Sequence, residues 1–203
     1  MKKKNILIIL VVLFIIGSIV NLFNSNDTSK QQQTNNQQEE NSNNKELKIN
    51  VDYSTISPTS KDLKEALNQE FKVKDVVYDS DSKTLKITFN GDSASNGRYA
   101  VKQTALKGAS ILKLLKDNKA IENIYYYYNM DVVDDKGNTS KENVVQAGFT
   151  REIWNSINVN TWHDLLIQKN FYTKFYTTAD TFLIYPSIQK ELPKEDLDNI
   201  YIK

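Results

Sequence analysis

The sequence predicts an α+β fold, a two-layer sandwich of antiparallel hairpins with helices on one face, preceded by one N-terminal transmembrane helix. Three observations support this prediction: an uncharged apolar run near the N-terminus, a polar tract after it, and alternating strand-like and helix-like periodicities in the remainder. Hairpins interspersed with amphipathic helices favour an antiparallel sheet covered by helices on one side. The chain has no βαβ periodicity with glycine-rich turns, which argues against a Rossmann-type domain.

The N-terminal segment, residues 1–23, is predicted to be a signal anchor. Lys2, Lys3 and Lys4 precede an apolar run of 18 residues, 6–23, which as a helix spans ~27 Å, close to a ~30 Å hydrocarbon core. A cleaved signal peptide is the alternative, but it needs a shorter apolar core and small residues at the cleavage site, and 19–23 has no Ala-x-Ala-like site. We expect residues 6–23 to contact the lipid bilayer, with the lysines in the cytoplasm and the C-terminal domain outside the cell membrane.

Residues 24–46 are predicted to be a disordered polar linker. No apolar residue occurs between Phe23 and Leu47, and the tract is rich in Asn, Gln, Ser and Thr. Such a segment cannot bury enough apolar surface to offset the entropy of ordering it. Residues 47–203 then form the extracytoplasmic α+β domain.

Composition excludes several classes of function. The formal net charge is +1, and without the three N-terminal lysines the remainder is slightly acidic, so the chain lacks the basic surface of a nucleic-acid-binding domain. The chain contains no cysteine. Disulfides, thiolate metal sites, a cysteine nucleophile and a lipobox-type anchor are therefore excluded.

The first half of the domain is predicted to contain a strand, a helix and a hairpin. Residues 47–53 alternate apolar and polar side chains, as a half-buried strand does. A helix begins around 58–60, where Thr59 and Asp62 have the spacing of a capping pair. Its apolar stripe comprises Leu63, Ala66, Leu67 and Phe71. Residues 73–78 and 85–89 are β-rich and flank the turn-forming cluster 79–83.

A long helix over 99–118 follows, because Val101, Ala105, Leu112 and Leu115 recur at helical spacing. Gly108 lies within this stripe and indicates close packing of the helix against a sheet. A second hairpin comprises a strand over 124–133, a turn over 134–138 and a returning strand over 139–149. The remaining expected features are an N-cap at Thr150 for a short helix, a helix over 164–169 and another over 177–183.

The run Tyr125, Tyr126, Tyr127 and Tyr128 is the candidate binding feature. Successive side chains of a strand face opposite ways, so two tyrosines point to each face of the sheet. One pair is expected in the core against the long helix. The other pair is either covered by the aromatic C-terminal tail, which the tail's supply of rings favours, or exposed for protein or sugar recognition.

The sequence nominates no catalytic residue, no metal site and no cofactor. His163 is the only histidine, and the expectation is a surface or capping residue. The acidic clusters 79–81 and 131–138 lack the spacing of a calcium loop and are expected to be hairpin turns. With 25 acidic residues, no carboxylate pair for glycoside hydrolysis can be singled out.

From about residue 100 to 190, the chain resembles a group of uncharacterised secreted or membrane-attached proteins of Gram-positive bacteria. The resemblance rests on the long helix, the Asp-x-Lys-Gly-Asn turn at 134–138, and the T-R-E-x-x-N-x-I-N segment at 150–158, together with Ala179-Asp180 and Tyr185-Pro186. Those motifs are structural. The resemblance implies an extracytoplasmic location and an α+β fold, and it implies no activity.

Three functions are compatible with the sequence. The first is a membrane-anchored extracytoplasmic binding or interaction domain whose partner is an envelope protein, and it is preferred because no catalytic signature is present. The second is a carboxylate-dependent cell-wall hydrolase. The third is a structural subunit of a secretion or conjugation assembly, which rests on layout alone.

Overall fold

The chain divides into two units, residues 1–45 and 46–203. The computed structural model describes residues 51–91, 96–134, 136–168 and 171–201, all in the second unit. Its elements are α2 (Lys61–Phe71), β1 (Val73–Asp79), β2 (Thr84–Asn90), α3 (Gly97–Leu114), β3 (Asn123–Val133), β4 (Thr139–Thr150), α4 (Arg151–Ser156), α5 (Val159–Gln168), α6 (Thr173–Thr178), β5 (Thr181–Ile184), α7 (Pro186–Gln189) and α8 (Lys194–Tyr201).

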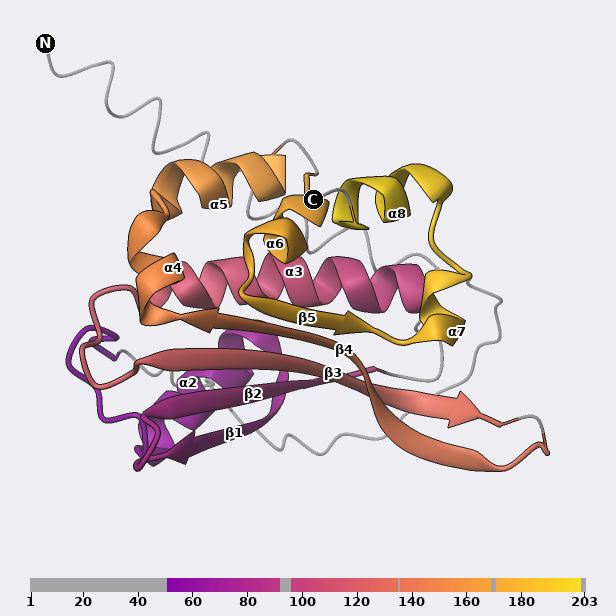
Figure 1. The fold of residues 1–203 in the computed structure, drawn as a ribbon. Coiled ribbons are helices and arrows are strands. Elements are labelled where there is room, and N and C mark those ends of the chain that lie inside the picture. The colour runs from indigo at the N-terminus through magenta and orange to yellow at the C-terminus, as the bar shows by residue number, and fades with distance from the viewer. Residues whose placement is uncertain (1–50, 92–95, 135, 169–170, 202–203) are drawn as a thin grey trace, which may run out of the picture. The chain divides into compact units, whose positions relative to one another are not determined.

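The fold is α+β, with the five strands in one mixed sheet ordered β1-β2-β3-β4-β5. Figure 1 shows α3, α5, α6 and α8 on one side of this sheet. The expected transmembrane helix over 6–23 and the linker over 24–46 lie outside the described residues. Among the described helices, none combines the length and the apolar character needed to cross a membrane.

Helix α2 begins one residue later than the expected capping pair implies. Ser60 has an extended backbone, and its hydroxyl accepts a hydrogen bond from the Leu63 N–H at 3.0 Å. Ser60 is therefore the N-cap, and the prediction of Thr59 was wrong; the Thr59 hydroxyl instead contacts the Ser57 hydroxyl at 2.9 Å. The helix ends at Lys72, which adopts the left-handed conformation with φ 53°. The predicted apolar stripe of α2 is buried.

The strand expected over 47–53 is not present in its described part, residues 51–53. Asp52 starts a turn instead. Its carboxylate accepts hydrogen bonds from the Ser54 N–H at 3.0 Å and the Thr55 hydroxyl at 2.9 Å, and its carbonyl accepts from the Ile56 N–H at 2.9 Å. Local hydrogen bonds of this kind compete with strand pairing, so the alternating pattern did not decide the structure.

The sheet is not purely antiparallel, because β2 and β3 pair in parallel. This corrects the expectation of a wholly antiparallel sheet. The reason is the connection: α3 has 18 residues and as a helix spans ~27 Å, so it returns the chain to the end of the sheet at which β2 began. Crossover connections that contain a helix produce parallel strands, whereas tight turns produce antiparallel ones.

Both predicted hairpins are present. β1 pairs with β2, and β3 with β4, in antiparallel register. The second turn is held by the Asp134 carboxylate, which accepts from the Lys136 and Asn138 N–H groups at 2.9 and 2.8 Å. Gly137 provides the required positive φ of 83°. The far halves of β3 and β4 extend as a two-stranded arm beyond the other strands, as Figure 1 shows.

The C-terminal tail contains a strand that the sequence analysis missed. The helix expected over 177–183 was wrong: α6 ends at Thr178, and β5 pairs with β4 from Thr181 onward. Phe182 and Ile184 face the core, and the alternating Thr181 and Leu183 are exposed. The helix expected over 164–169 is α5, which begins earlier, at Val159.

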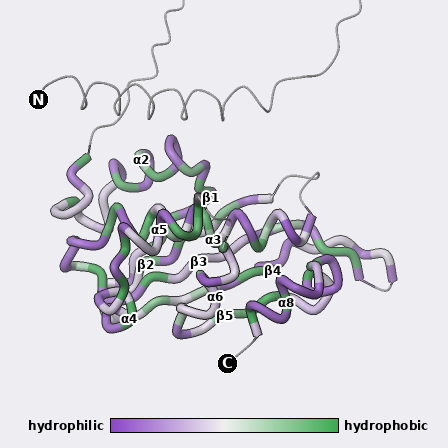
Figure 2. Tube along the Cα trace, turned by 90° about the horizontal axis from the view of Figure 1, so that it is seen from above, coloured by the Kyte–Doolittle hydropathy of each residue, from purple (hydrophilic) through white to green (hydrophobic). Residues whose placement is uncertain are grey.

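The core lies between the sheet and the helices, and aromatic rings fill its centre. The Phe175 ring packs against the rings of Tyr126 and Phe149, with centroids 5.8 and 4.9 Å apart. Close packing at Gly108 is confirmed, since a Cβ there would lie 2.6 Å from Phe175 Cζ and 3.4 Å from Tyr126 Cδ2. Figure 2 shows hydrophobic stretches along the strands and a hydrophilic α8.

Candidate functional site

The tyrosine run divides between the two faces of the sheet. Tyr126 and Tyr128 are buried on the helix side, and the Tyr126 ring stacks on Phe89 at 6.2 Å between centroids. Burial raises the pKa of Tyr126 well above its ordinary value. The tail therefore covers the same face as the long helix, because Phe175 packs on Tyr126. The interpretation in which the tail covers the second tyrosine pair was wrong.

Tyr125 and Tyr127 lie on the opposite face and are partly exposed. We call this surface the open sheet face. In Figure 1 it is the side of the sheet away from α3, α5, α6 and α8. Strand register places two rows of side chains on it: Val77, Lys86, Tyr125, Gly148 and Thr181 in the first row, and Asp75, Thr88, Tyr127, Gln146 and Leu183 in the second.

Tyr125 leans across the sheet onto Gly148 of the neighbouring strand. An added Cβ at Gly148 would lie 2.4 Å from Tyr125 Cε1 and 2.7 Å from Tyr125 Cδ1. The same position is 2.8 Å from the Thr181 hydroxyl oxygen. The ring thus occupies the space that any other residue at 148 would fill, and it lies along the sheet surface beside a hydroxyl group. Aromatic cover over a glycine on a paired strand is a known way to stabilise a sheet.

Polar groups surround the two rings on the open sheet face. Tyr127 lies between Thr88 on β2 and Gln146 on β4. Burial, and secondly the neighbouring Tyr125, raise the pKa of Tyr127 above its ordinary value. The two rows contain two charged residues, Lys86 and Asp75, and the Asp75 carboxylate pairs with the Lys64 ammonium of α2 at 2.7 Å. The apolar side chains lie at the edges of the sheet, with Val77 on β1 50% exposed and Leu183 on β5 47% exposed.

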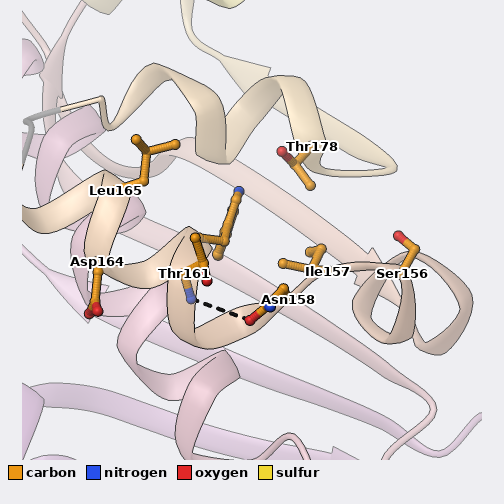
Figure 3. Close-up of a pocket in the computed structure, with 8 residues that line it drawn as sticks. Ser156, Ile157, Asn158, Thr161, Asp164, Leu165 and Thr178 are labelled. Atoms are coloured by element: carbon orange, nitrogen blue, oxygen red, sulfur yellow. Dashed lines mark hydrogen bonds between the residues drawn. The ribbon is translucent and has the colours of Figure 1, made fainter.

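A separate pocket of about 590 Å³ lies along α5. Figure 3 shows its lining, which comprises Ser156, Ile157, Asn158, Thr161, Trp162, Asp164, Leu165 and Thr178. Its volume is within the range of small-molecule sites, and its polar groups are hydroxyls, one amide and one carboxylate. The indole N–H of Trp162 is buried and has no hydrogen-bond partner among the described residues. A single carboxylate cannot provide the paired acid and base of a glycosidase.

His163 was expected to be a surface or capping residue, and the structure places it at intermediate burial, with its side chain 17% exposed. Its Nε2 lies 3.1 Å from the Ser110 hydroxyl, and its Nδ1 lies 3.3 Å from the Asp164 carboxylate. The sequence of contacts, from a serine hydroxyl to a histidine ring to an aspartate carboxylate, matches that of a hydrolytic triad. Sequence reasoning missed Ser110, since 53 residues separate it from His163 and no motif marks it.

The Ser110–His163–Asp164 arrangement fits helix packing better than catalysis. Ser110 lies inside α3, and its hydroxyl also bonds the Leu106 carbonyl at 3.0 Å. Backbone N–H groups within a helix are already bonded to carbonyls one turn earlier, so they cannot form an oxyanion hole beside this hydroxyl. The arrangement is a polar contact that joins α5 to α3.

The acidic clusters behave as turns. Asp79 accepts from the Asp81 N–H at 3.0 Å, and hydrogen bonds within the turns lower the pKa values of Asp79 and Asp134. No group of three or more His, Asp or Glu side chains in the described residues is arranged to hold a metal ion. The comparisons with known proteins are negative: no family model, no curated protein and no solved structure matches this chain.

Proposed function

We propose that the chain is a membrane-anchored extracytoplasmic binding domain that engages a component of the cell envelope through the open sheet face. Residues 6–23 would span the membrane, residues 24–46 would serve as a flexible tether, and the N-terminal lysines would remain in the cytoplasm. The apolar run, the positive-inside rule and the polar composition of the tether support this arrangement. An envelope protein is the partner expected from the sequence.

The observation that carries the proposal is the position of Tyr125 and Tyr127. Both rings lie on the side of the sheet that the described helices leave open, and aromatic side chains are enriched at recognition surfaces because each combines a large apolar area with a polar group. A sheet with one face in water usually shows small polar or charged side chains there. Two adjacent partly exposed tyrosines at its centre favour binding over simple solvation.

The carboxylate-dependent hydrolase has no support from the geometry. Four pockets in the described part of the chain contain one carboxylate each, contributed by Asp164, Asp180, Asp117 and Asp75. The pKa of Asp75 is lowered, first by its hydrogen bond with Lys64, whereas a catalytic acid needs a raised pKa. No specific feature favours the secretion-assembly alternative either.

The test is a cross-linking pull-down from intact cells with the full-length tagged protein. The Tyr125→Ala/Tyr127→Ala double variant should lose the captured component, whereas Tyr99→Ala should retain it. Tyr99 is a matched control because its ring is 44% exposed and lies on α3, away from the open sheet face. Equal capture by all three proteins would refute a role for this face. Loss of the captured component when residues 6–23 are deleted would support the membrane anchor.

A further inference from the structure

The arrangement of side chains on the open sheet face identifies the kind of ligand it suits. In a protein–protein interface, apolar residues gather at the centre and polar residues form the rim. Here the order is reversed. The centre of the face has Tyr125, Tyr127 and Gln146 on the middle strands, and the apolar side chains of Val77 and Leu183 lie on the two edge strands. Four strand spacings of about 4.8 Å separate those edges by roughly 19 Å.

The chemistry at the centre is an aromatic ring bordered by neutral hydrogen-bonding groups on β4 and β5 and by Lys86 on β2. Tyr125 lies along the sheet over Gly148, with the Thr181 hydroxyl at the same point. The Gln146 amide and the Thr88 hydroxyl flank Tyr127 in the second row. Amides and hydroxyls both donate and accept hydrogen bonds. A ligand that matches this surface needs one flat apolar face together with many hydroxyl or amide groups at its edge.

Two other ligand classes fit less well. A nucleic acid would need a cluster of cations to neutralise its phosphates, and Lys86 is the only cation in the two rows of this face. A folded protein would need a well-packed apolar centre with pockets for anchoring side chains, and the apolar residues of this face are peripheral. A pyranose sugar has what the surface requires, because its C–H groups form a flat apolar face and its hydroxyls project outward.

We propose that the open sheet face binds a saccharide, with a sugar ring stacked on Tyr125 and its hydroxyl groups bonded to Gln146, Thr181 and the Tyr127 hydroxyl. This inference rests on the proposed function and specifies its ligand class. Tyr125 supplies the stacking contact, and Gly148 is part of the site because only glycine leaves room for the ring to lean onto the sheet.

The experiment is a titration of the full-length protein in detergent with the β-1,4-linked tetrasaccharide of N-acetylglucosamine, and separately with cellotetraose, followed by saturation-transfer NMR and calorimetry. Tyr125→Ala should weaken binding roughly tenfold, since an aromatic stacking contact contributes on the order of one tenfold step in affinity. Tyr125→Phe keeps the ring and should bind within about twofold of the native protein. Tyr99→Ala should leave binding unchanged.

Gly148→Ala provides a second route to the same contact. The new methyl group would displace the Tyr125 ring without deleting it, so binding should weaken while the ring remains in the chain. Retained thermal unfolding in each variant would show that the fold is intact. The proposal is supported if either saccharide binds the native protein, even weakly, and binds less tightly to both Tyr125→Ala and Gly148→Ala.

Two outcomes would overturn it. The first is no binding of either tetrasaccharide to the native protein at about 10 mM, a concentration that saturates even weak millimolar sites. The second is equal binding by Tyr125→Ala. If the pull-down captures a protein that depends on Tyr125 while neither saccharide binds, the saccharide inference fails and the proposed binding function stands. If neither experiment depends on the tyrosines, both fail.

Discussion

Gly108 lies where α3 passes closest to the aromatic core, and its replacement by alanine tests the packing account. A Cβ at this position would lie 2.6 Å from Phe175 Cζ and 2.9 Å from Phe175 Cε2. Optimal carbon–carbon contacts are about 3.5–4.0 Å, so the overlap is about 1 Å. Phe175 is fully buried and is surrounded by other rings, so it has no open space into which it can swing.

Two effects of opposite sign decide the result of Gly108→Ala. Alanine stabilises a helix interior by about 1 kcal/mol relative to glycine. Overpacking of a close-packed core costs about 1–3 kcal/mol, and occasionally more. Because the clash is deep and involves two atoms of an immobile ring, we expect the cost to prevail and the free energy of unfolding to fall by about 1–2 kcal/mol.

The assay is thermal unfolding of the full-length chain, followed by far-UV circular dichroism. Tyr99→Ala on the same helix is the control, because Tyr99 is exposed, and it should change the stability by no more than about 0.5 kcal/mol, as surface substitutions usually do. An unchanged or raised unfolding temperature for Gly108→Ala would show that α3 does not approach Phe175 as closely as described.

Three further predictions follow from individual contacts. Arg151→Lys should lower the free energy of unfolding by about 2–3 kcal/mol in chemical denaturation, because the guanidinium bonds the Ile121 and Asn118 carbonyls and a lysine cannot reproduce that fork. Ser110→Ala should lower the free energy of unfolding by about 1 kcal/mol, and both the native protein and this variant should hydrolyse 4-nitrophenyl acetate only at the background rate. An esterase activity that the native protein has and Ser110→Ala lacks would show that the His163 contact is catalytic. The pKa of Asp134 is lowered, first by its hydrogen bond with Asn138. The ionised carboxylate therefore stabilises the turn at pH values above the unfolded pKa of about 3.9, and this stabilisation is lost as the pH falls through the lower pKa of the folded state. An NMR titration of the Asp134 carboxyl group with a midpoint at or above about 3.9 would contradict this prediction.

Local patterns predicted the hairpins and the long helix because these elements depend on neighbouring residues. Alternation in 85–89 and the β-rich composition of 124–133 predicted strands, and the turn chemistry of 134–138 predicted the reversal of the second hairpin. The parallel pairing of β2 with β3 was missed because strand direction depends on where a connection ends in space. The 18 residues of α3 are enough to cross the sheet, so β3 begins at the same end of the sheet as β2.

The tail and the candidate site show the limits of sequence reasoning in a different way. Strand β5 has four residues, too few for a period to be distinguished, and its pairing with β4 is non-local. The sequence separated the tyrosines into two pairs by the two-residue period of a strand. It could not show which pair the tail covers, because that depends on the side of the sheet to which residues 171–201 return. Similarly, only the fold brings His163 to Ser110.

The most direct test of the binding function is photo-cross-linking from two positions of the same chain in intact cells. A benzophenone amino acid at Leu183, exposed on the open sheet face, is compared with one at Lys174, exposed on α6. We predict an adduct from Leu183 that disappears when Tyr125 is replaced by alanine, and no adduct from Lys174. An adduct from Lys174 alone, or a Leu183 adduct that persists when Tyr125 is replaced, would contradict the binding function.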